Sequence, residues 1–295
     1  TGPVSNFVFD AVLPAGGNMI ITAIDTTGAE GTDTIVNVEV LSIGGTNYTV
    51  VAGSNGNNNN LNGFNGSGGS QIVFGLNGND VINGGTGNDI LVGGAGNDAL
   101  NGGTGTDIAI FNGNILNYNI STADGTNLVV SDTTGAEGTD TLNSIETLNF
   151  AGTNYTWQSG TNTANTINTG AGSQIVLGRG GNDTINAGAD DDYIDGGEGN
   201  DTINAGAGND IIVQTSNTGG RDFIDGGEGT DYYVLNGATG AETFRIYTRD
   251  AAASAGIGIN NANTEIVITR STGGAESVIA ELDNIEEIVI DSLDV

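Results

Sequence analysis

The residues GLNGNDVINGGTGNDILVGGAGNDALNGGTGTDIAI, numbers 75–110, divide into four consecutive nonapeptides with the pattern G-G-x-G-x-D-x-U-x, in which U is a large apolar residue. The segment GRGGNDTINAGADDDYIDGGEGNDTINAGAGNDIIV, residues 178–213, contains four more, and GGEGTDYYV follows at 226–234. A constant period of this kind predicts a solenoid, in which each repeat stacks on its neighbours.

The last three residues of each repeat predict a short strand whose middle, apolar side chain points inward. The Gly-rich six-residue turn before it needs left-handed backbone conformations, which Gly adopts most easily. Since one repeat of nine residues forms half a coil, repeats 18 residues apart lie on the same side. We expect an all-β fold in which two parallel β-solenoids alternate with three small β flanks.

A longer repeat surrounds the blocks of nonapeptides. Residues 25–49 and 132–156 are identical at 17 of 25 positions, and a diverged third copy runs from Glu265 to Ile290. Alternating apolar residues on either side of an acidic turn predict strands in each copy. The expected domains are an N-terminal flank at 1–54, a first roll at 55–113, a middle flank at 114–158, a second roll at 159–237 and a C-terminal flank at 238–295.

The sixth position of the repeat carries a carboxylate. Its members are Asp80, Asp89, Asp98, Asp107, Asp183, Asp192, Asp201, Asp210, Asp222 and Asp231. The 18-residue spacing predicts that these residues form columns along each side of the solenoid. Degenerate repeats before each block carry an amide at this position, which predicts weak metal binding or none; these residues are Gln71, Asn165 and Gln174.

The composition excludes several kinds of chemistry. The chain has no Cys and no His, which excludes disulfides, thiol catalysis, a Ser–His pair and Cys- or His-ligated metals. With 5 Lys+Arg against 36 Asp+Glu, the net charge is −31, which disfavours nucleic acid and anionic membranes as partners. No apolar run is long enough for membrane insertion.

Calcium is the ligand that the repeats predict. Stacked carboxylates repel one another strongly, so a column of Asp residues needs cations. Hard oxygen donors, without His or Cys, favour Ca²⁺ over other biological metals. The alternative is that the Gly-Asn-Asp sequences are tight turns of a solenoid that needs no metal.

These nonapeptides resemble the RTX (repeats-in-toxin) family, whose repeats form a calcium-bound parallel β-roll. The resemblance implies that the Asp carboxylate and the glycine carbonyl groups of each loop bind Ca²⁺, with roughly 8 ions in the chain. The glycines concerned are Gly84, Gly85, Gly87, Gly93, Gly94, Gly96, Gly102, Gly103, Gly105, Gly196, Gly197, Gly199, Gly206, Gly208, Gly226, Gly227 and Gly229. Weaker carboxylate candidates are Asp33 and Asp140, in loops of the flanks, and Asp190, which replaces the fourth Gly of its repeat.

The resemblance also implies export from a bacterium by a type I system, with folding outside the cell or at its surface. The first hypothesis is a non-enzymatic structural protein that self-associates in a surface layer, filament or adhesin, because rolls and flanks fill the chain. The alternative is the calcium-dependent secretion and folding module of a larger RTX enzyme or toxin. A third is an ice- or glycan-binding adhesin region, suggested by Thr86 and Thr104 in loops on one side.

Overall fold

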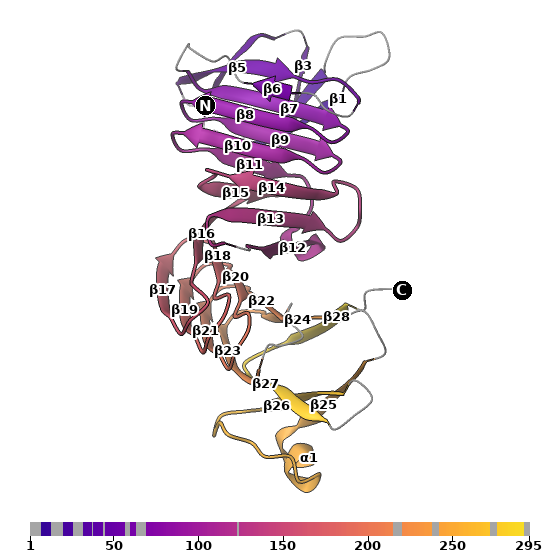
Figure 1. Cartoon of the computed structure of the whole chain (residues 1–295), viewed down its shortest axis with the longest axis vertical. Coiled ribbons are helices and arrows are strands. Elements are labelled where there is room, and N and C mark those ends of the chain that lie inside the picture. Colours follow the sequence, from indigo (N-terminus) through magenta and orange to yellow (C-terminus); the bar gives the residue numbers. More distant parts are fainter. Residues whose placement is uncertain are drawn as a thin grey trace. The chain divides into compact units, whose positions relative to one another are not determined.

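The computed structural model of the chain describes residues 7–12, 20–25, 32–36, 38–43, 45–56, 60–62, 69–122, 124–214, 220–237, 242–271 and 276–291. Within these residues the regular structure is almost entirely β-strand (Figure 1), with the short helix α1 at Arg249–Ser254 and a 3-10 helix at Ile115–Asn117. The expected all-β fold is confirmed. None of the helices in this part of the chain is long and apolar enough to cross a membrane.

The first of two compact units, Thr1–Thr156, contains two parallel ladders of strands. One ladder has the order β6-β8-β10-β14, and the other has the order β5-β7-β9-β11-β15. Paired residues are 18 apart within the repeats, as in Leu100 opposite Ile82 and Leu91 opposite Val73. The strands are β5 (Thr46–Ala52), β6 (Asn60–Asn62), β7 (Gln71–Asn77), β8 (Val81–Thr86), β9 (Ile90–Ala95), β10 (Ala99–Thr104), β11 (Ile108–Phe111), β14 (Thr139–Asn143) and β15 (Thr147–Phe150).

Antiparallel strands adjoin these ladders. On one side β13 (Asn127–Asp132) pairs with β14, and β12 (Tyr118–Ser121) pairs with β13. On the other, β4 (Val40–Ile43) pairs with β5, and β16 (Thr153–Ser159) pairs with β15. A further antiparallel sheet consists of β1 (Phe7–Val12), β2 (Ile20–Asp25) and β3 (Thr32–Val36). The predicted middle flank therefore supplies β14 and β15 to the parallel ladders themselves.

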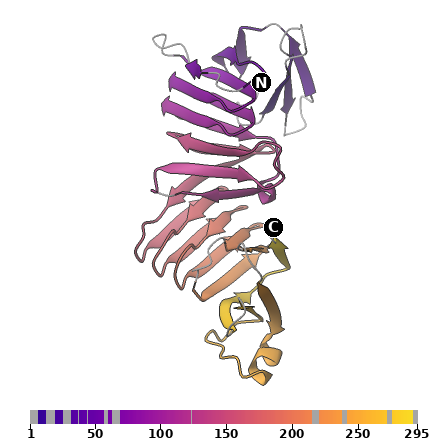
Figure 2. The same ribbon diagram turned by 45° about the vertical axis from the view of Figure 1, so that its right-hand side comes forward.

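The second unit, Trp157–Val295, also contains two parallel ladders, whose successive turns can be followed in Figure 2. Their orders are β17-β19-β21-β23-β27 and β18-β20-β22-β24-β28, and the antiparallel strands β26 and β25 follow β27. The strands are β17 (Thr166–Ala171), β18 (Gln174–Leu177), β19 (Thr184–Ala189), β20 (Tyr193–Asp195), β21 (Thr202–Ala207), β22 (Ile211–Gln214), β23 (Asp222–Glu228), β24 (Tyr232–Asn236), β25 (Thr243–Thr248), β26 (Ile266–Ser271), β27 (Ser277–Asp283) and β28 (Glu287–Asp291).

The middle and C-terminal flanks share one topology. Each has a three-stranded antiparallel meander, β12-β13-β14 or β25-β26-β27. The third strand of the meander joins one parallel ladder, and the next strand, β15 or β28, joins the other. The diverged third copy of the long repeat therefore keeps its strand order although its sequence has changed.

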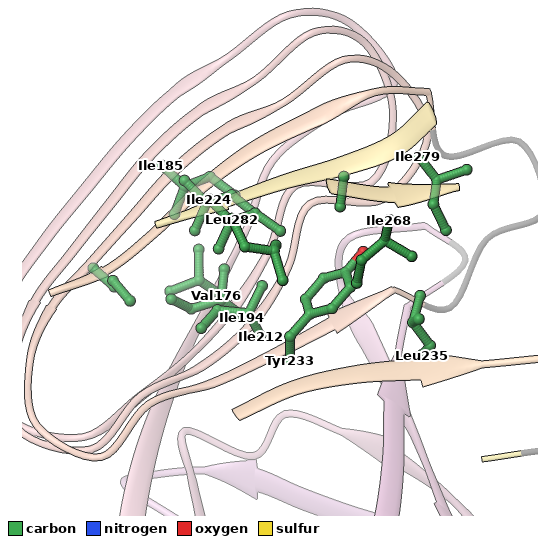
Figure 3. Packing of buried hydrophobic residues seen from close by; sticks show 14 of the residues in the cluster. Val176, Ile185, Ile194, Ile212, Ile224, Tyr233, Leu235, Ile268, Ile279 and Leu282 are labelled. Carbon is green, nitrogen blue, oxygen red and sulfur yellow. The ribbon is translucent and has the colours of Figure 1, made fainter. Parts of the chain in front are cut away.

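The two ladders of the second unit enclose a narrow apolar core. One ladder supplies Ile185, Ile224 and Leu282, and the other supplies Ile194 and Tyr233 (Figure 3). Except for β27, each strand contributes only one or two buried residues to this core cluster, and a buried large apolar side chain contributes about 1.5–3 kcal/mol. Ordering the backbone costs roughly 1–2 kcal/mol per residue. A core this thin needs additional stabilisation from another source.

Close stacking of the turns makes Gly188 a sharp test of this fold. Its φ is +120°, and a Cβ added there would overlap the Gly170 carbonyl oxygen of the preceding turn. Gly170 occupies the paired position, but a Cβ added there has nothing within 4 Å.

We expect Gly188→Ala to lower the free energy of unfolding by more than the ~1–2 kcal/mol cost of a left-handed backbone, because the overlap adds to it. Gly170→Ala should change it little. Urea unfolding of both variants at saturating Ca²⁺ measures the difference, and equal midpoints would contradict the observed stacking.

Candidate metal centre

The repeat Asp residues form columns along the ladders, as their spacing predicted. Column 1 contains Asp80, Asp98 and Asp140; column 2 contains Gln71, Asp89, Asp107 and Glu146; column 3 contains Asn165, Asp183, Asp201 and Asp222; column 4 contains Gln174, Asp192, Asp210, Asp231 and Glu286. The ten repeat Asp residues and Asp140 are at most 5% exposed. Columns 1 and 2 lie in the first unit, and columns 3 and 4 lie in the second.

Each column is held by one repeated hydrogen bond. The backbone N–H of each member donates to a carboxylate oxygen of the next member, with N to O distances of 2.6–2.9 Å. The sequence separation is 18 residues between Asp183 and Asp201 and 21 between Asp201 and Asp222, so the insertion before Asp222 leaves the column intact. The bond fixes the rotamer of each carboxylate and directs its second oxygen elsewhere.

The second carboxylate oxygen, Oδ2, has no hydrogen bond in most members of the columns. Among the described residues, this buried atom lacks a partner in Asp89, Asp98, Asp107, Asp183, Asp192, Asp201, Asp210 and Asp231. A buried, ionised oxygen without a donor is strongly unfavourable. Such an atom, repeated along four columns, indicates that a cation belongs beside it.

The first glycine of each repeat leaves room beside this oxygen. A Cβ added at Gly196 would lie 2.6 Å from Oδ2 of Asp201, and one added at Gly178 would lie 2.7 Å from Oδ2 of Asp183. The Cβ added at Gly178 would also overlap the Gly196 carbonyl oxygen. A carboxylate oxygen and a carbonyl oxygen therefore converge on the same place. The place is therefore lined by the hard oxygen donors that Ca²⁺ prefers.

The other predicted glycines shape the loops. The second and fourth positions of the repeat have positive φ, namely Gly85, Gly87, Gly94, Gly96, Gly103, Gly105, Gly197, Gly199, Gly206, Gly208, Gly227 and Gly229. The first-position glycines Gly84, Gly93, Gly102 and Gly226 resemble Gly196, since an added Cβ would meet the Asp Oδ2 of the same loop. Where the pattern is broken, Leu76, Arg179 and Asp190 adopt positive φ without being Gly, which strains the backbone.

Burial raises the pKa of the column carboxyls. Desolvation is the largest cause, and it raises the pKa of Asp98 to about 6 and that of Asp201 to about 7. The pKa of Asp140 and of Asp222 is raised to about 8, again chiefly by desolvation. A neighbouring carboxylate of the same column raises each of these values further, while the backbone hydrogen bond lowers it. Without a cation, ionising the columns therefore opposes folding.

The weaker candidates lie in different places. Asp140 is a full member of column 1, because its Oδ1 accepts the N–H of Asp98 at 2.8 Å. Asp190 is exposed, and its carboxylate accepts the N–H of Gly172 at 2.9 Å, so it lies outside the columns. Asp33 belongs to β3, but its side chain lies outside the described part of the structure.

The amide positions were predicted to bind metal weakly or not at all, and Gln71 differs from the Asp positions in a way that fits this prediction. The Gln71 side chain donates Nε2–H to the Gly84 carbonyl oxygen at 3.1 Å. At Asp89, the next member of column 2, the equivalent carbonyl is that of Gly102. A Cβ added at Gly84 would lie 2.7 Å from the Gly102 carbonyl oxygen and would overlap Asp89 Oδ2, so both oxygens face the same place. The amide hydrogen of Gln71 thus has the role that a cation would have at Asp89.

The sequence interpretation missed two acidic residues. Glu146 and Glu286 end columns 2 and 4, where each accepts the backbone N–H of the preceding Asp. The shared sequence Ile-Glu at 145–146 and 285–286, within the long repeat, was the available signal. In the described part of the chain no group of three or more His, Cys, Asp or Glu side chains could hold a metal.

Comparison with known proteins agrees with this geometry. The family model of the RTX calcium-binding nonapeptide repeat matches in four copies, over residues 74–109, 159–189, 177–212 and 218–239, so the chain contains these repeats. The extracellular lipase LipA from Serratia marcescens is a similar solved structure, with 20% identity and a TM-score of 0.32. The similarity covers 76% of this chain and 40% of the lipase chain. A comparison with curated proteins finds no match.

The raised pKa values predict how the calcium-free chain responds to pH. The folded carboxyls titrate near pH 6–7 in Asp98 and Asp201, against 3.8 for the unperturbed group. Their contribution to stability is fully present below about pH 3.8 and is lost as pH rises through about 6–7. In this range the folded state still holds protons that the unfolded state has released, so a rise in pH favours unfolding. In calcium-free buffer, the β-sheet signal in circular dichroism should therefore fall from pH 5 to pH 8. A signal that rises over this range would contradict the buried, cation-free columns.

Proposed function

We propose that this chain is the calcium-dependent structural part of a secreted protein, in which Ca²⁺ binding drives folding of both rolls. The single observation that carries the proposal is the row of buried Asp Oδ2 atoms without donors among the described residues, several of which face a carbonyl oxygen at a first-position glycine, as at Gly84 and Gly178. The RTX repeats support it, because they bind Ca²⁺ and are typical of proteins that type I systems export. We place the mature protein outside a bacterial cell or at its surface.

The proposed ligands are the column carboxylates and the carbonyl groups of the repeat glycines. Within the columns, the Asp residues supply negative charge and the Gly carbonyls supply neutral oxygen, a mixture that suits the flexible coordination of Ca²⁺. The weight of evidence differs between candidates. Asp140 is supported by its place in column 1, whereas the exposed position of Asp190 gives it no such support.

The energy of binding is also the energy of folding in this proposal. The thin apolar core and the desolvated carboxylates leave the calcium-free state with little stability, and a net charge of −31 adds repulsion. Ca²⁺ would reverse both effects by neutralising the columns and by joining adjacent turns. The chain would then remain unfolded where Ca²⁺ is scarce and fold where it is abundant.

We further propose that the folded chain self-associates, as a component of a surface layer, a filament or an adhesin. Within the described residues, β25 is the last strand of its sheet, and Ile246 on this strand is 50% exposed. An edge strand with exposed apolar side chains is suited to pairing with another chain. The alternative is a folding module of a larger RTX enzyme or toxin, which needs the same columns but no self-association.

A charge-neutral substitution tests the metal role of the columns. Asp201→Asn keeps an oxygen that can accept the N–H of Asp183 but removes the buried charge. We expect the Ca²⁺ concentration for half-maximal folding to rise at least about tenfold, the lower end of the cost of disturbing a metal site. In calcium-free buffer the same variant should have at least as much β-sheet signal as the wild type, because one fewer buried carboxylate is desolvated.

Glu228→Gln is the matched control, because it removes one exposed negative charge from the same unit. Calcium titrations followed by circular dichroism compare the two variants. If both variants shift the titration equally, general charge repulsion accounts for the calcium dependence and the columns are not metal sites.

Removal of calcium tests self-association. We expect the purified chain to form ordered sheets or filaments in electron microscopy when Ca²⁺ is present, and to lose them in a chelator, because unfolded and charged chains repel each other. Static light scattering provides the same comparison in solution. Calcium-folded monomers at every protein concentration would refute self-association and favour the secretion and folding module.

A further inference from the structure

The ends of columns 2 and 4 contain a feature that the repeats lack. The last nonapeptides of the two blocks carry Asp107 and Asp231, and the next carboxylate in each column comes from a flank, 39 and 55 residues further along the chain. These carboxylates, Glu146 and Glu286, are outside the nonapeptide pattern. Their positions can be compared with those of an ordinary member of the column.

The backbone register places each Glu where the next Asp would be. Ile108 pairs with Thr147, and Tyr232 pairs with Glu287, so the residues before these pairs are Asp107 opposite Glu146 and Asp231 opposite Glu286. The side chains repeat the hydrogen bond of the columns. Glu146 Oε2 accepts the N–H of Asp107 at 2.8 Å, and Glu286 Oε2 accepts that of Asp231 at 2.9 Å.

A carbonyl group of the flank also takes the place of a glycine carbonyl. A Cβ added at Gly102 would overlap the Ser144 carbonyl oxygen and would lie 2.5 Å from Asp107 Oδ2. At Gly226 the corresponding atoms are the Asn284 carbonyl oxygen and Asp231 Oδ2, the latter at 2.6 Å. Ser144 and Asn284 have φ of 49° and 48°, so the same left-handed turn presents the carbonyl in both flanks.

The two end sites keep the unsatisfied oxygen that points to a ligand. Asp107 and Asp231 are both 0% exposed, and in the described part of the chain the Oδ2 atom of each accepts no hydrogen bond. Glu146 and Glu286, in contrast, are exposed. Each end site thus has one buried carboxylate, one flank carbonyl and one carboxylate that reaches in from solvent.

We infer that Glu146 and Glu286 are calcium ligands, which close an end site in each unit together with Asp107 and Ser144 or Asp231 and Asn284. This inference rests on the proposed calcium binding of the columns and extends it to residues of the flanks. The flanks are then part of the metal-binding structure, and each one docks on its roll through an ion. A role as a simple backbone cap would require only the hydrogen bond to the Asp N–H.

The substitution Glu→Gln separates these two roles. Gln keeps a side-chain oxygen that can accept the N–H of Asp107 or Asp231, so a simple cap would be preserved, but it lacks the charge that a calcium ligand supplies. In the full chain we expect Glu286→Gln to lose one bound Ca²⁺ in native mass spectrometry, Glu146→Gln to lose one, and the double variant to lose two.

Glu287→Gln is the matched control, since it removes the same charge one residue away, at the exposed start of β28. It should bind as many ions as the wild type. Hydrogen exchange of β28 in limiting Ca²⁺ gives a second measurement, with faster exchange expected in Glu286→Gln than in Glu287→Gln even if both variants fold.

The outcomes distinguish this inference from the proposed function. A wild-type chain that binds no Ca²⁺ would refute both. A wild-type chain that binds several ions, together with Gln variants that match Glu287→Gln in ion count and in β28 exchange, would refute only the end sites. The Glu residues would then be caps.

Discussion

Negative charge is buried in this protein at a fixed spacing, and the rest of the structure depends on how that charge is compensated. In every column the N–H of one residue and one oxygen of the next carboxylate satisfy each other, which leaves the second oxygen dependent on something outside the chain. Desolvation opposes ionisation of these groups, and neighbouring carboxylates add to this effect. Because most strands contribute only one or two residues to the apolar core, the core cannot offset this cost alone. With the proposed calcium binding, folding is linked to a cation through the same atoms that define the repeat.

The regularity of the sequence follows from this one loop. Where a glycine stands first in the repeat, carboxylate oxygen occupies the place that a Cβ would take, as at Gly196; two repeats have Ala187 and Ala205 at this position instead. The second and fourth positions must adopt positive φ, which L-residues do only at a cost. The Asp must point at the loop and the apolar residue at the core, so few of the nine positions are left unconstrained. Where Arg179 or Asp190 replaces Gly, the backbone conformation is retained and the strain is accepted locally.

The constant nine-residue period of the sequence was sufficient to predict the parts of the structure that repeat with it. The 18-residue register, the four Asp columns and the inward Ile and Leu all follow from nine-residue spacing, and Asp140 was found because its loop keeps the nonapeptide form. The period could not reveal that β14, β15, β27 and β28 extend the ladders, because their pairing depends on the flanks folding back. Glu146 was missed for the same reason. Glu146 lies two positions after Ser144, whereas Asp107 lies five positions after Gly102, so the local pattern differs although the final positions agree.

The direction of the hydrogen bonds explains why the two ends of a column differ. Along a column the N–H of each member is accepted by a carboxylate of the following member, whereas the side chain of the first member accepts no N–H from the column. An amide is therefore sufficient at the start, and Gln71 even uses its own N–H to satisfy the carbonyl that a cation would otherwise face. At the other end Asp107 and Asp231 still need an acceptor for their N–H, and the nonapeptides have no further residue to supply it. In columns 2 and 4 the flank provides that carboxylate through Glu146 and Glu286, whereas columns 1 and 3 end on Asp140 and Asp222 themselves. Glu has a longer side chain than Asp, so it reaches this position although its backbone no longer follows the nonapeptide loop. The roll and its flank are therefore joined where the repeats end.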